Sequence, residues 1–246
     1  MIERLSELSD QALEALYTPP PGRFVRAGFV ASLDGAVEVA GRSAALGSDD
    51  DHRVFITLRS LCDVVLVGSG TARTENYGPA KLRAPLRARR VERGQPELPP
   101  IAVVNADASM DPGGRLFVGH DAGASDGPRP LVLCSARATR QRRAALSEVA
   151  TVIECGDERV DVNLALAALA DMGLNSVLCE GGPTLAGLLI KAGKLDELCL
   201  SQAMVLAGPG HQPLSAGAPF DDIVRLTLGH LLVGAGVLVG RWEVRP

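Results

Sequence analysis

The stretch "VLCEGGPTLAGLLIKAGKLDELCL", residues 177–200, carries three structural signals in succession. It opens with an apolar run typical of a buried strand, turns at Gly181 and Gly182, and continues with apolar residues at helical spacing. A single carboxylate, Glu180, lies between the strand-like run and the glycines. The stretch therefore predicts a strand-to-helix junction of an α/β protein with a carboxylate at the end of the strand.

The same alternation extends outward on both sides of this junction. Short runs rich in Val, Ile and Leu, bounded by Gly, Pro, Asn or Asp, predict strands covered on both faces. They lie at residues 23–37, 63–68, 100–105, 130–135, 149–155 and 175–180. Helical patterns lie between several of them, at 49–62, 139–148, 161–173 and 182–194. The predicted fold class is α/β, with a mostly parallel central sheet flanked by helices.

The two ends of the chain depart from this alternation. Apolar spacing at residues 4–16, closed by "TPPPG", predicts a peripheral helix, so we divide the chain into an N-terminal helix and linker (1–23) and a single domain (24–246). Residues 196–210 and 231–246 are longer strand-like runs without an ordinary helix between them, which predicts an antiparallel C-terminal edge. The arginine-rich segment 81–100 and the Gly- and Asp-rich segment 119–130 are predicted to be exposed loops.

Composition argues against several classes of function. No apolar run approaches the ~20 residues that span a bilayer, so no membrane association is expected. A formal net charge of −4 and 3% aromatic residues give little attraction for nucleic acid. The five cysteines form no CxxC pair and predict reduced, buried thiols in a cytoplasmic protein. The four histidines have no metal-ligand spacing, so no metal site is predicted.

Two glycine-bearing junctions indicate nucleotide binding. "VLVGSGTARTENYG" (65–78) and "VLCEGGPTLAG" (177–187) each follow a strand-like run. A glycine there lets the backbone approach a phosphate, and free helix N–H groups favour negative charge. Gly181 and Gly182 alone are explained equally by a tight turn, whereas two such junctions favour a nucleotide. Neither matches G-x-G-x-x-G followed by an acidic residue, which argues against an ordinary Rossmann domain.

Two charged residues leave alternatives open. Asp34 precedes Gly35 in an apolar segment and is explained either by a turn or by a polar group that faces a ligand. Arg59 lies beside the apolar helix face formed by Val54, Leu58 and Leu61. It is either a solvated helix residue or a bidentate partner for a substrate phosphate.

Three blocks together resemble one family. "ASLDGAVEVAGRS" (31–43), "LRSLCDVVLVGSGTARTENYG" (58–78) and the opening stretch (177–200) are similar, in order and spacing, to the signature blocks of the riboflavin-biosynthesis pyrimidine reductases. That family has a dihydrofolate-reductase-like fold. The resemblance covers roughly residues 24–245.

The resemblance implies an activity and a set of site residues. The family uses NADPH to reduce the ring-opened ribose of 5-amino-6-(5-phosphoribosylamino)uracil to ribityl. The residues that match its cofactor-binding positions are Val30, Gly68, Thr71, Glu75, Gly181, Gly182, Pro183, Thr184 and Leu185. Ser43, Arg59 and Glu180 would contact the phosphorylated pyrimidine, and Asp34 or Glu180 would handle the proton. The resemblance also implies a homodimer.

The sequence departs from the family's pattern at several points. It contains neither the His-x-Glu nor the Pro-Cys-x-x-Cys motif of the associated zinc deaminase, so only the reductase reaction is implied. Gly28 replaces a lysine, Ala45 replaces a tryptophan, and only Arg83 lies near the position of an expected arginine. These departures concern the substrate half of the site. Two alternatives therefore stay open: a dihydrofolate reductase on the same fold, and a non-catalytic NADPH-binding protein.

Overall fold

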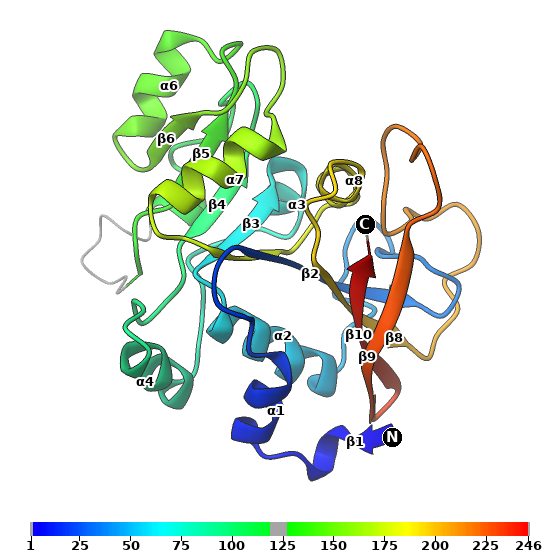
Figure 1. Ribbon diagram of the computed structural model, residues 1–246. Helices are drawn as coiled ribbons and strands as arrows, with labels where there is room; N and C mark the ends of the chain where they lie inside the picture. Colours follow the sequence, from blue (N-terminus) through cyan, green and yellow to red (C-terminus); the bar gives the residue numbers. More distant parts are fainter. Residues whose placement is uncertain (1, 119–126, 246) are drawn as a thin grey trace.

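The computed structural model describes residues 2–118 and 127–245, which form one large twisted sheet with helices on both faces (Figure 1). The strand order is β1-β9-β10-β8-β2-β7-β3-β4-β5-β6. The strands are β1 Ile2–Arg4, β2 Phe24–Ser32, β3 Val64–Gly68, β4 Ile101–Val104, β5 Leu131–Cys134, β6 Thr151–Glu154, β7 Ser176–Cys179, β8 Glu197–Ala203, β9 Arg225–Gly234 and β10 Val237–Arg245. The helices are α1 Asp10–Tyr17, α2 Asp49–Leu61, α3 Ser69–Thr74, α4 Ala84–Glu92, α5 Arg115–Val118, α6 Arg140–Ser147, α7 Val162–Asp171 and α8 Pro183–Lys191.

The central strands are buried on both faces, as their continuous apolar runs predicted. In β3, Val65 and Val67 face the core under α1 and α2, whereas Val64 and Leu66 face the core under α7 and α8. Figure 1 shows the two helix pairs on opposite sides of the sheet. The predicted mostly parallel sheet is confirmed, since β2, β3, β4, β5, β6 and β7 pair only in parallel with one another and β8 is parallel to β2.

The predicted antiparallel C-terminal edge is present, with one correction. β10 pairs antiparallel with β8, and also with β9. The run 231–246 is therefore two strands rather than one, divided by a turn at Ala235 and Gly236. Gly236 has a φ of 71°, a left-handed conformation that glycine adopts readily, and this allows the tight reversal.

The N-terminal segment differs from the single helix predicted over residues 4–16. Ile2–Arg4 form β1, which pairs in parallel with β9, and Leu5–Glu7 form a 3-10 turn. The helix begins only at Asp10, because the side chain of Ser9 accepts a hydrogen bond from the N–H of Ala12 and caps it there. Leu5 and Tyr17 are fully buried in the same core as α2.

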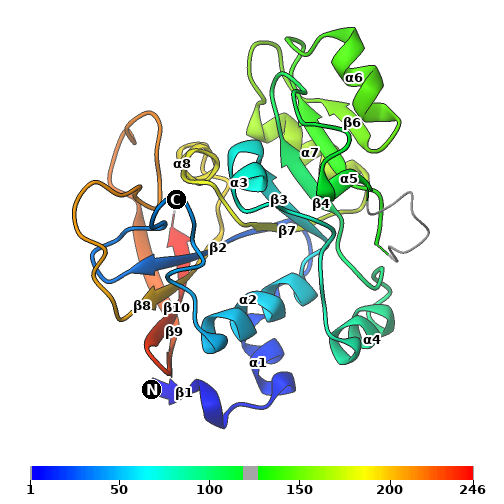
Figure 2. The ribbon, with the colours of Figure 1, turned by 180° about the vertical axis from the view of Figure 1, so that it is seen from behind.

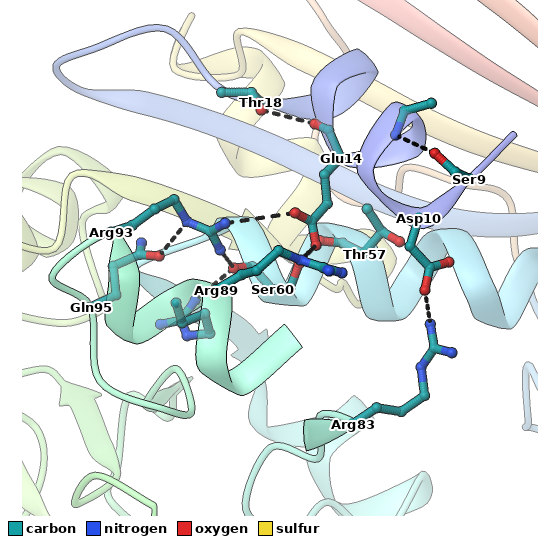
Figure 3. A network of polar contacts seen from close by, with 12 residues as sticks. Ser9, Asp10, Glu14, Thr18, Thr57, Ser60, Arg83, Arg89, Arg93 and Gln95 are labelled. Atoms are coloured by element: carbon teal, nitrogen blue, oxygen red, sulfur yellow. Dashed lines mark hydrogen bonds and ion pairs between the residues drawn. The ribbon is translucent and has the colours of Figure 1, made fainter. Parts of the chain in front are cut away.

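The arginine-rich segment 81–100 was predicted to be a solvated loop, and this was wrong. It contains α4, whose Arg90 is fully buried and donates to the carbonyls of Ser60 and Cys62 at the end of α2. Figure 3 shows Glu14 of α1 between Arg89 of α4 and Arg93, the residue that follows α4. Buried arginines that satisfy helix carbonyls explain why this charged segment is ordered.

Residues 119–126 of the predicted loop 119–130 lie outside the described residues. Within the described ranges, none of the helices is long and apolar enough to cross a bilayer. All five cysteines are buried and free of disulfides.

Candidate active site

The site lies where β3 and β7, neighbours in the sheet, reach their carboxyl ends. β3 continues into α3, which packs Ala72 on one face of the sheet, and β7 continues into α8, which packs Leu185 on the other. Neighbouring parallel strands whose chains diverge to opposite faces leave a crevice between them. Both views show α3 and α8 beside each other at this end of the sheet (Figures 1 and 2). The N–H of Gly68 donates to the carbonyl of Gly181 at 2.7 Å and joins the two glycine junctions.

Two adjoining cavities open at this crevice. The larger has a volume of about 500 Å³ and extends over β2, β8 and most of α2. The smaller, about 290 Å³, lies between α3 and α8. Both are lined by Glu38, Thr71, Glu75, Gly182 and Pro183, so they form one continuous depression.

The structure brings most of the predicted site residues to this depression. Val30, Ser43 and Glu180 line the larger cavity, and Gly68, Thr184 and Leu185 line the smaller. Thr71, Glu75, Gly182 and Pro183 line both. Gly181, Arg59 and Asp34 do not line either cavity.

Glu180 is held by two partners from other elements. Its Oε1 and Oε2 accept hydrogen bonds from Nε and Nη2 of Arg59 at 2.6 and 2.7 Å, and Oε2 also accepts one from Tyr77 Oη at 2.7 Å. The Glu180 side chain is only 1% exposed, and that of Arg59 14%. The Phe55 ring covers the guanidinium at 4.4 Å. A bidentate pair with this little solvent holds the carboxylate in one orientation.

Burial and charge act against each other in this cluster. Burial alone would lower the pKa of Arg59, but the adjacent Glu180 carboxylate outweighs it and the net shift is upward. Burial, followed by the Glu180 charge, raises the pKa of Tyr77 well above its usual value. Arg59 therefore stays charged, and the Tyr77 hydroxyl keeps its proton as a donor.

Ser43 and Glu75 are connected directly. Glu75 Oε1 accepts hydrogen bonds from the Ser43 N–H at 2.8 Å and from its hydroxyl at 2.9 Å. The loop that follows β2 is thereby fixed to the end of α3. A residue predicted to contact substrate and one predicted to contact cofactor thus lie side by side at the junction of the two cavities.

Asp34 lies in an exposed turn, where it organises a loop. Its carboxylate accepts hydrogen bonds from the Ser32 hydroxyl and from the N–H groups of Ala207 and Gly208, the latter two at 3.1 and 2.8 Å. These bonds, that of Ser32 first, lower the pKa of Asp34 to about 2. The turn interpretation of Asp34 agrees with this geometry, and Asp34, unlike Glu180, is not among the residues that line the cavities.

The smaller cavity fits a dinucleotide phosphate. A Cβ added at Gly70 of α3 would meet no protein atom within 4 Å, so the backbone there faces open space. Gly182 is packed more tightly, since a Cβ would lie 2.5 Å from Thr71 Oγ1. Backbone that lines the cavity at both junctions, with the hydroxyl-bearing Thr71 and Thr184 beside it, suits a pyrophosphate.

Several lining residues were not found from the sequence. Tyr77 lies two residues after Glu75 in the sequence block 58–78. Its position beside a predicted site residue could have identified it as a candidate. Asp51 lines the larger cavity and is hydrogen-bonded to Ser201 of β8. It is one of three consecutive aspartates at the start of α2, and nothing in the sequence distinguishes it from the other two.

The chain matches the family described as the RibD C-terminal domain over residues 23–239. A 2,5-diamino-6-ribosylamino-4(3H)-pyrimidinone 5′-phosphate reductase of Methanothermobacter thermautotrophicus is 29% identical over 202 residues, 80% of this chain and 87% of that protein. Its Archaeoglobus fulgidus counterpart is 27% identical, over 77% and 84% of the two chains. A pyrimidine reductase-like protein from Corynebacterium diphtheriae superposes with a TM-score of 0.81 and 27% identity, over 91% of this chain and 92% of that one.

The fold and the match over most of the chain define a reductase domain with a dihydrofolate-reductase-like sheet. The chain belongs to the RibD C-terminal domain family. The family and fold predicted from the three sequence blocks are confirmed.

Proposed function

We propose that the protein reduces the ribosyl group of a 5-amino-6-ribosylaminopyrimidine 5′-phosphate to ribityl, as a step of riboflavin biosynthesis. Family membership and the names of the relatives support this oxidoreductase function. One observation of the structure carries it: a single depression joins the glycine junctions to a carboxylate held by Arg59 and Tyr77. A cofactor bound in the smaller cavity and a substrate bound in the larger one would meet beside Glu180.

NADPH is the cofactor we propose for the smaller cavity and its opening into the larger one. Gly70, Gly182 and the start of α8 would hold the pyrophosphate through backbone N–H groups, and Gly68 would line the same cavity. Thr71 and Thr184 would add hydroxyl contacts. Val30, which lines the larger cavity, would face the nicotinamide, which supplies the hydride when bound. We expect calorimetry to show tighter binding of NADPH than of NADH.

The pyrimidine would occupy the larger cavity between α2 and the loop after β2. The reaction adds a hydride to C1 of the imine form of the sugar, and the imine nitrogen takes up a proton. No covalent nucleophile is needed, so the chain's task is to orient two bound molecules and supply a proton. Ser43 and Glu180 would contact the substrate, which is supported by their position in the lining of this cavity. We assign Arg59 a positioning role, because its guanidinium is occupied by Glu180.

Steady-state turnover tests the proposal against both alternatives. Oxidation of NADPH should follow addition of the ribosylaminopyrimidine phosphate and should fail with dihydrofolate. Turnover of dihydrofolate alone would favour the dihydrofolate reductase alternative. Binding of NADPH without turnover of either compound would favour a non-catalytic NADPH-binding protein.

We further propose a homodimer formed through the C-terminal edge of the sheet. Leu226 and Leu228 of β9 are 43% and 47% exposed, on the same face as the partly buried Trp242. β1 pairs with β9 only at residues 231–233, which leaves the first half of β9 without a strand on its outer side among the described residues. Exposed leucines beside a free strand edge favour association with a second copy.

The cytoplasmic location stays a proposal. Five buried thiols without disulfides suit a reducing compartment, which supports it.

A further inference from the structure

The three aspartates that open α2 have different surroundings. Asp49 is exposed, and Asp50 accepts a hydrogen bond from the N–H of Ala235 at 2.7 Å and lies outside the cavity lining. Asp51 is partly buried, lines the larger cavity and accepts a hydrogen bond from the Ser201 side chain. Only Asp51 therefore combines burial with a place inside the proposed substrate cavity.

Asp51 has unused capacity to accept hydrogen bonds. An ionised carboxylate offers about four lone-pair positions. The Ser201 hydroxyl occupies one. Among the described residues no further donor to the Asp51 carboxylate is found, and the backbone N–H of Asp51 donates to Ser48 Oγ at 3.1 Å. Burial raises the pKa of the Asp51 carboxyl and outweighs the Ser201 hydrogen bond and the charge of His52, which both lower it. A ligand edge with two adjacent donors would stabilise the charged carboxylate.

The rest of the larger cavity has the same bias towards accepting hydrogen bonds. Its acidic lining residues are Glu38, Asp49, Asp51, Glu75 and Glu180. Glu180 is already paired with Arg59 and Tyr77 and Glu75 with Ser43, which leaves Glu38, Asp49 and Asp51 as the other carboxylates that face the cavity. Among the lining residues, all of which lie in the described part of the chain, none is lysine or arginine. A heterocycle rich in N–H donors fits this lining better than one that presents carbonyl oxygens, since a carbonyl facing a carboxylate is repelled.

The two candidate pyrimidines differ in the substituent on C2. A 2-amino-4(3H)-pyrimidinone presents its 2-amino group and its N3–H side by side, and these two donors match the two oxygens of a carboxylate. A uracil has a carbonyl in place of the 2-amino group, so one donor becomes an acceptor. A carboxylate pairs with the first edge in a bidentate manner and is mismatched with the second.

We propose that Asp51 binds the 2-amino and N3–H edge of the pyrimidine and makes the enzyme selective for the 2,5-diaminopyrimidinone over the corresponding uracil. This inference rests on the proposed function and adds the determinant of substrate choice. It also predicts how the choice can be reversed. An asparagine at this position can accept from N3–H through its carbonyl and donate to the C2 carbonyl of uracil through its amide.

The test compares kcat/KM for the two pyrimidine phosphates in the wild type and in Asp51→Asn. The wild type should prefer the 2-amino compound by about 10- to 100-fold, the range expected for one bidentate pair. In Asp51→Asn this ratio should fall to about one or invert. Asp50→Asn removes the same charge from the neighbouring position, outside the cavity, and should keep the wild-type ratio.

Asp51→Glu keeps the pair of acceptors and covers the case in which the asparagine variant does not fold. Its kcat/KM should fall, but the 2-amino compound should stay preferred. An unchanged ratio in Asp51→Asn, a wild-type preference for the uracil, or a lost preference in Asp51→Glu would overturn the role of Asp51 alone. Failure of the wild type to oxidise NADPH with either pyrimidine would overturn the proposed function as well.

Discussion

At the scale of single residues, Glu180 connects the sequence to the chemistry. The position of this carboxylate between a buried strand and a glycine turn is explained by the geometry of the site. The strand end places Glu180 at the bottom of the crevice, where Arg59 and Tyr77 hold it. A carboxylate with 1% exposure is stable there only because both oxygens have charged or hydroxyl partners.

Arg59→Ala should affect both stability and catalysis. It leaves Glu180 buried with Tyr77 as its remaining side-chain partner, so the free energy of unfolding should fall by about 3 kcal/mol and kcat/KM should fall as well. Arg59→Lys should recover part of each loss, because an ammonium keeps the charge without the planar fork. Denaturant titrations and steady-state kinetics with saturating cofactor measure the two effects.

Arg53→Ala is the matched control for that experiment. Arg53 lies on the same helix and pairs with Asp10 outside the cavities. Its loss should lower stability while kcat/KM stays at the wild-type value. Wild-type kcat/KM in Arg59→Ala would contradict the positioning role of Arg59.

Gly70→Ala tests the proposed pyrophosphate site in the smaller cavity without disturbing the fold. A Cβ at this helical position meets no protein atom within 4 Å, so the fold should be unchanged or stabilised by up to about 1 kcal/mol. The same methyl group would enter the space of the pyrophosphate and should raise the Kd for NADPH by about tenfold or more, which is ~1.4 kcal/mol.

Gly182→Val is a less clear test, because the new side chain would collide with Thr71 even without cofactor. Calorimetry and thermal unfolding of Gly70→Ala separate binding from folding. Unchanged NADPH affinity in this variant would place the phosphates elsewhere.

Sequence reasoning found the residues that carry a local signal. Thr71, Glu180 and Gly182 lie at strand-to-helix junctions, which a short window of sequence displays. It missed the partners of Glu180, because the pairing of Arg59 with a residue 121 positions away depends on strand order. It also could not single out Asp51, since its neighbour Ser201 lies on β8, 150 positions away in the sequence.

At the scale of elements, β9 and α1 form a buried polar contact away from the site. The His230 ring of β9 packs edge-on against Tyr17 of α1, with ring centroids 4.8 Å apart. Burial, followed by the positive charges of Arg241 and Arg26, lowers the pKa of His230 to about 4. The folded protein therefore favours the neutral ring.

This shift predicts a pH dependence of stability. The unfolded chain takes up a proton at His230 near pH 6.5, whereas the folded chain does so only near pH 4. The stabilising contribution is therefore complete above about pH 6.5 and is lost as the pH falls towards 4. Because the ring is partly solvated, we expect a loss of only about 1–2 kcal/mol.

Urea unfolding of the wild type and His230→Gln at neutral and mildly acidic pH measures this contribution as a difference. The wild type should lose more stability than the variant between the two conditions. Equal losses would show that His230 titrates normally in the folded protein.

The elements themselves were predictable to different degrees. The central strands and α2, α6, α7 and α8 follow from apolar periodicity. α4 was missed because its buried face consists of Leu86 and an arginine, Arg90, which a hydrophobic pattern does not count. β1 was not predicted, because a strand of three residues is too short to show a periodic pattern and its partner β9 is distant in the sequence.

At the scale of the whole molecule, the free edge of β9 is the surface through which we propose that the dimer forms. Leu228→Glu places a charge on the exposed face of β9 and should convert the proposed dimer into a monomer. Leu164→Glu on α7 is the control, since Leu164 is also exposed, at 52%, and lies away from the free edge of β9. Sedimentation of both variants beside the wild type reports the masses, and a monomeric wild type would contradict the interface.

The alternation of strands and helices predicted the fold class, but not the order of strands that builds the site. β7 lies between β2 and β3, although it follows them by more than a hundred residues. That insertion brings the two glycine junctions together, and no local pattern encodes it. The predicted division at residue 23 stays a prediction, although Leu5 and Tyr17 share the core of the following residues.

The transfer of a hydride to the sugar carbon is the central claim, and isotope transfer tests it most directly. The protein would be incubated with NADPH carrying deuterium at both positions of nicotinamide C4 and with the 2,5-diamino-6-ribosylaminopyrimidinone phosphate. Mass spectrometry and NMR of the product should show a ribityl chain with one deuterium, located at C1. A ribityl product without deuterium, or no ribityl product from a folded protein that binds NADPH, would contradict the account.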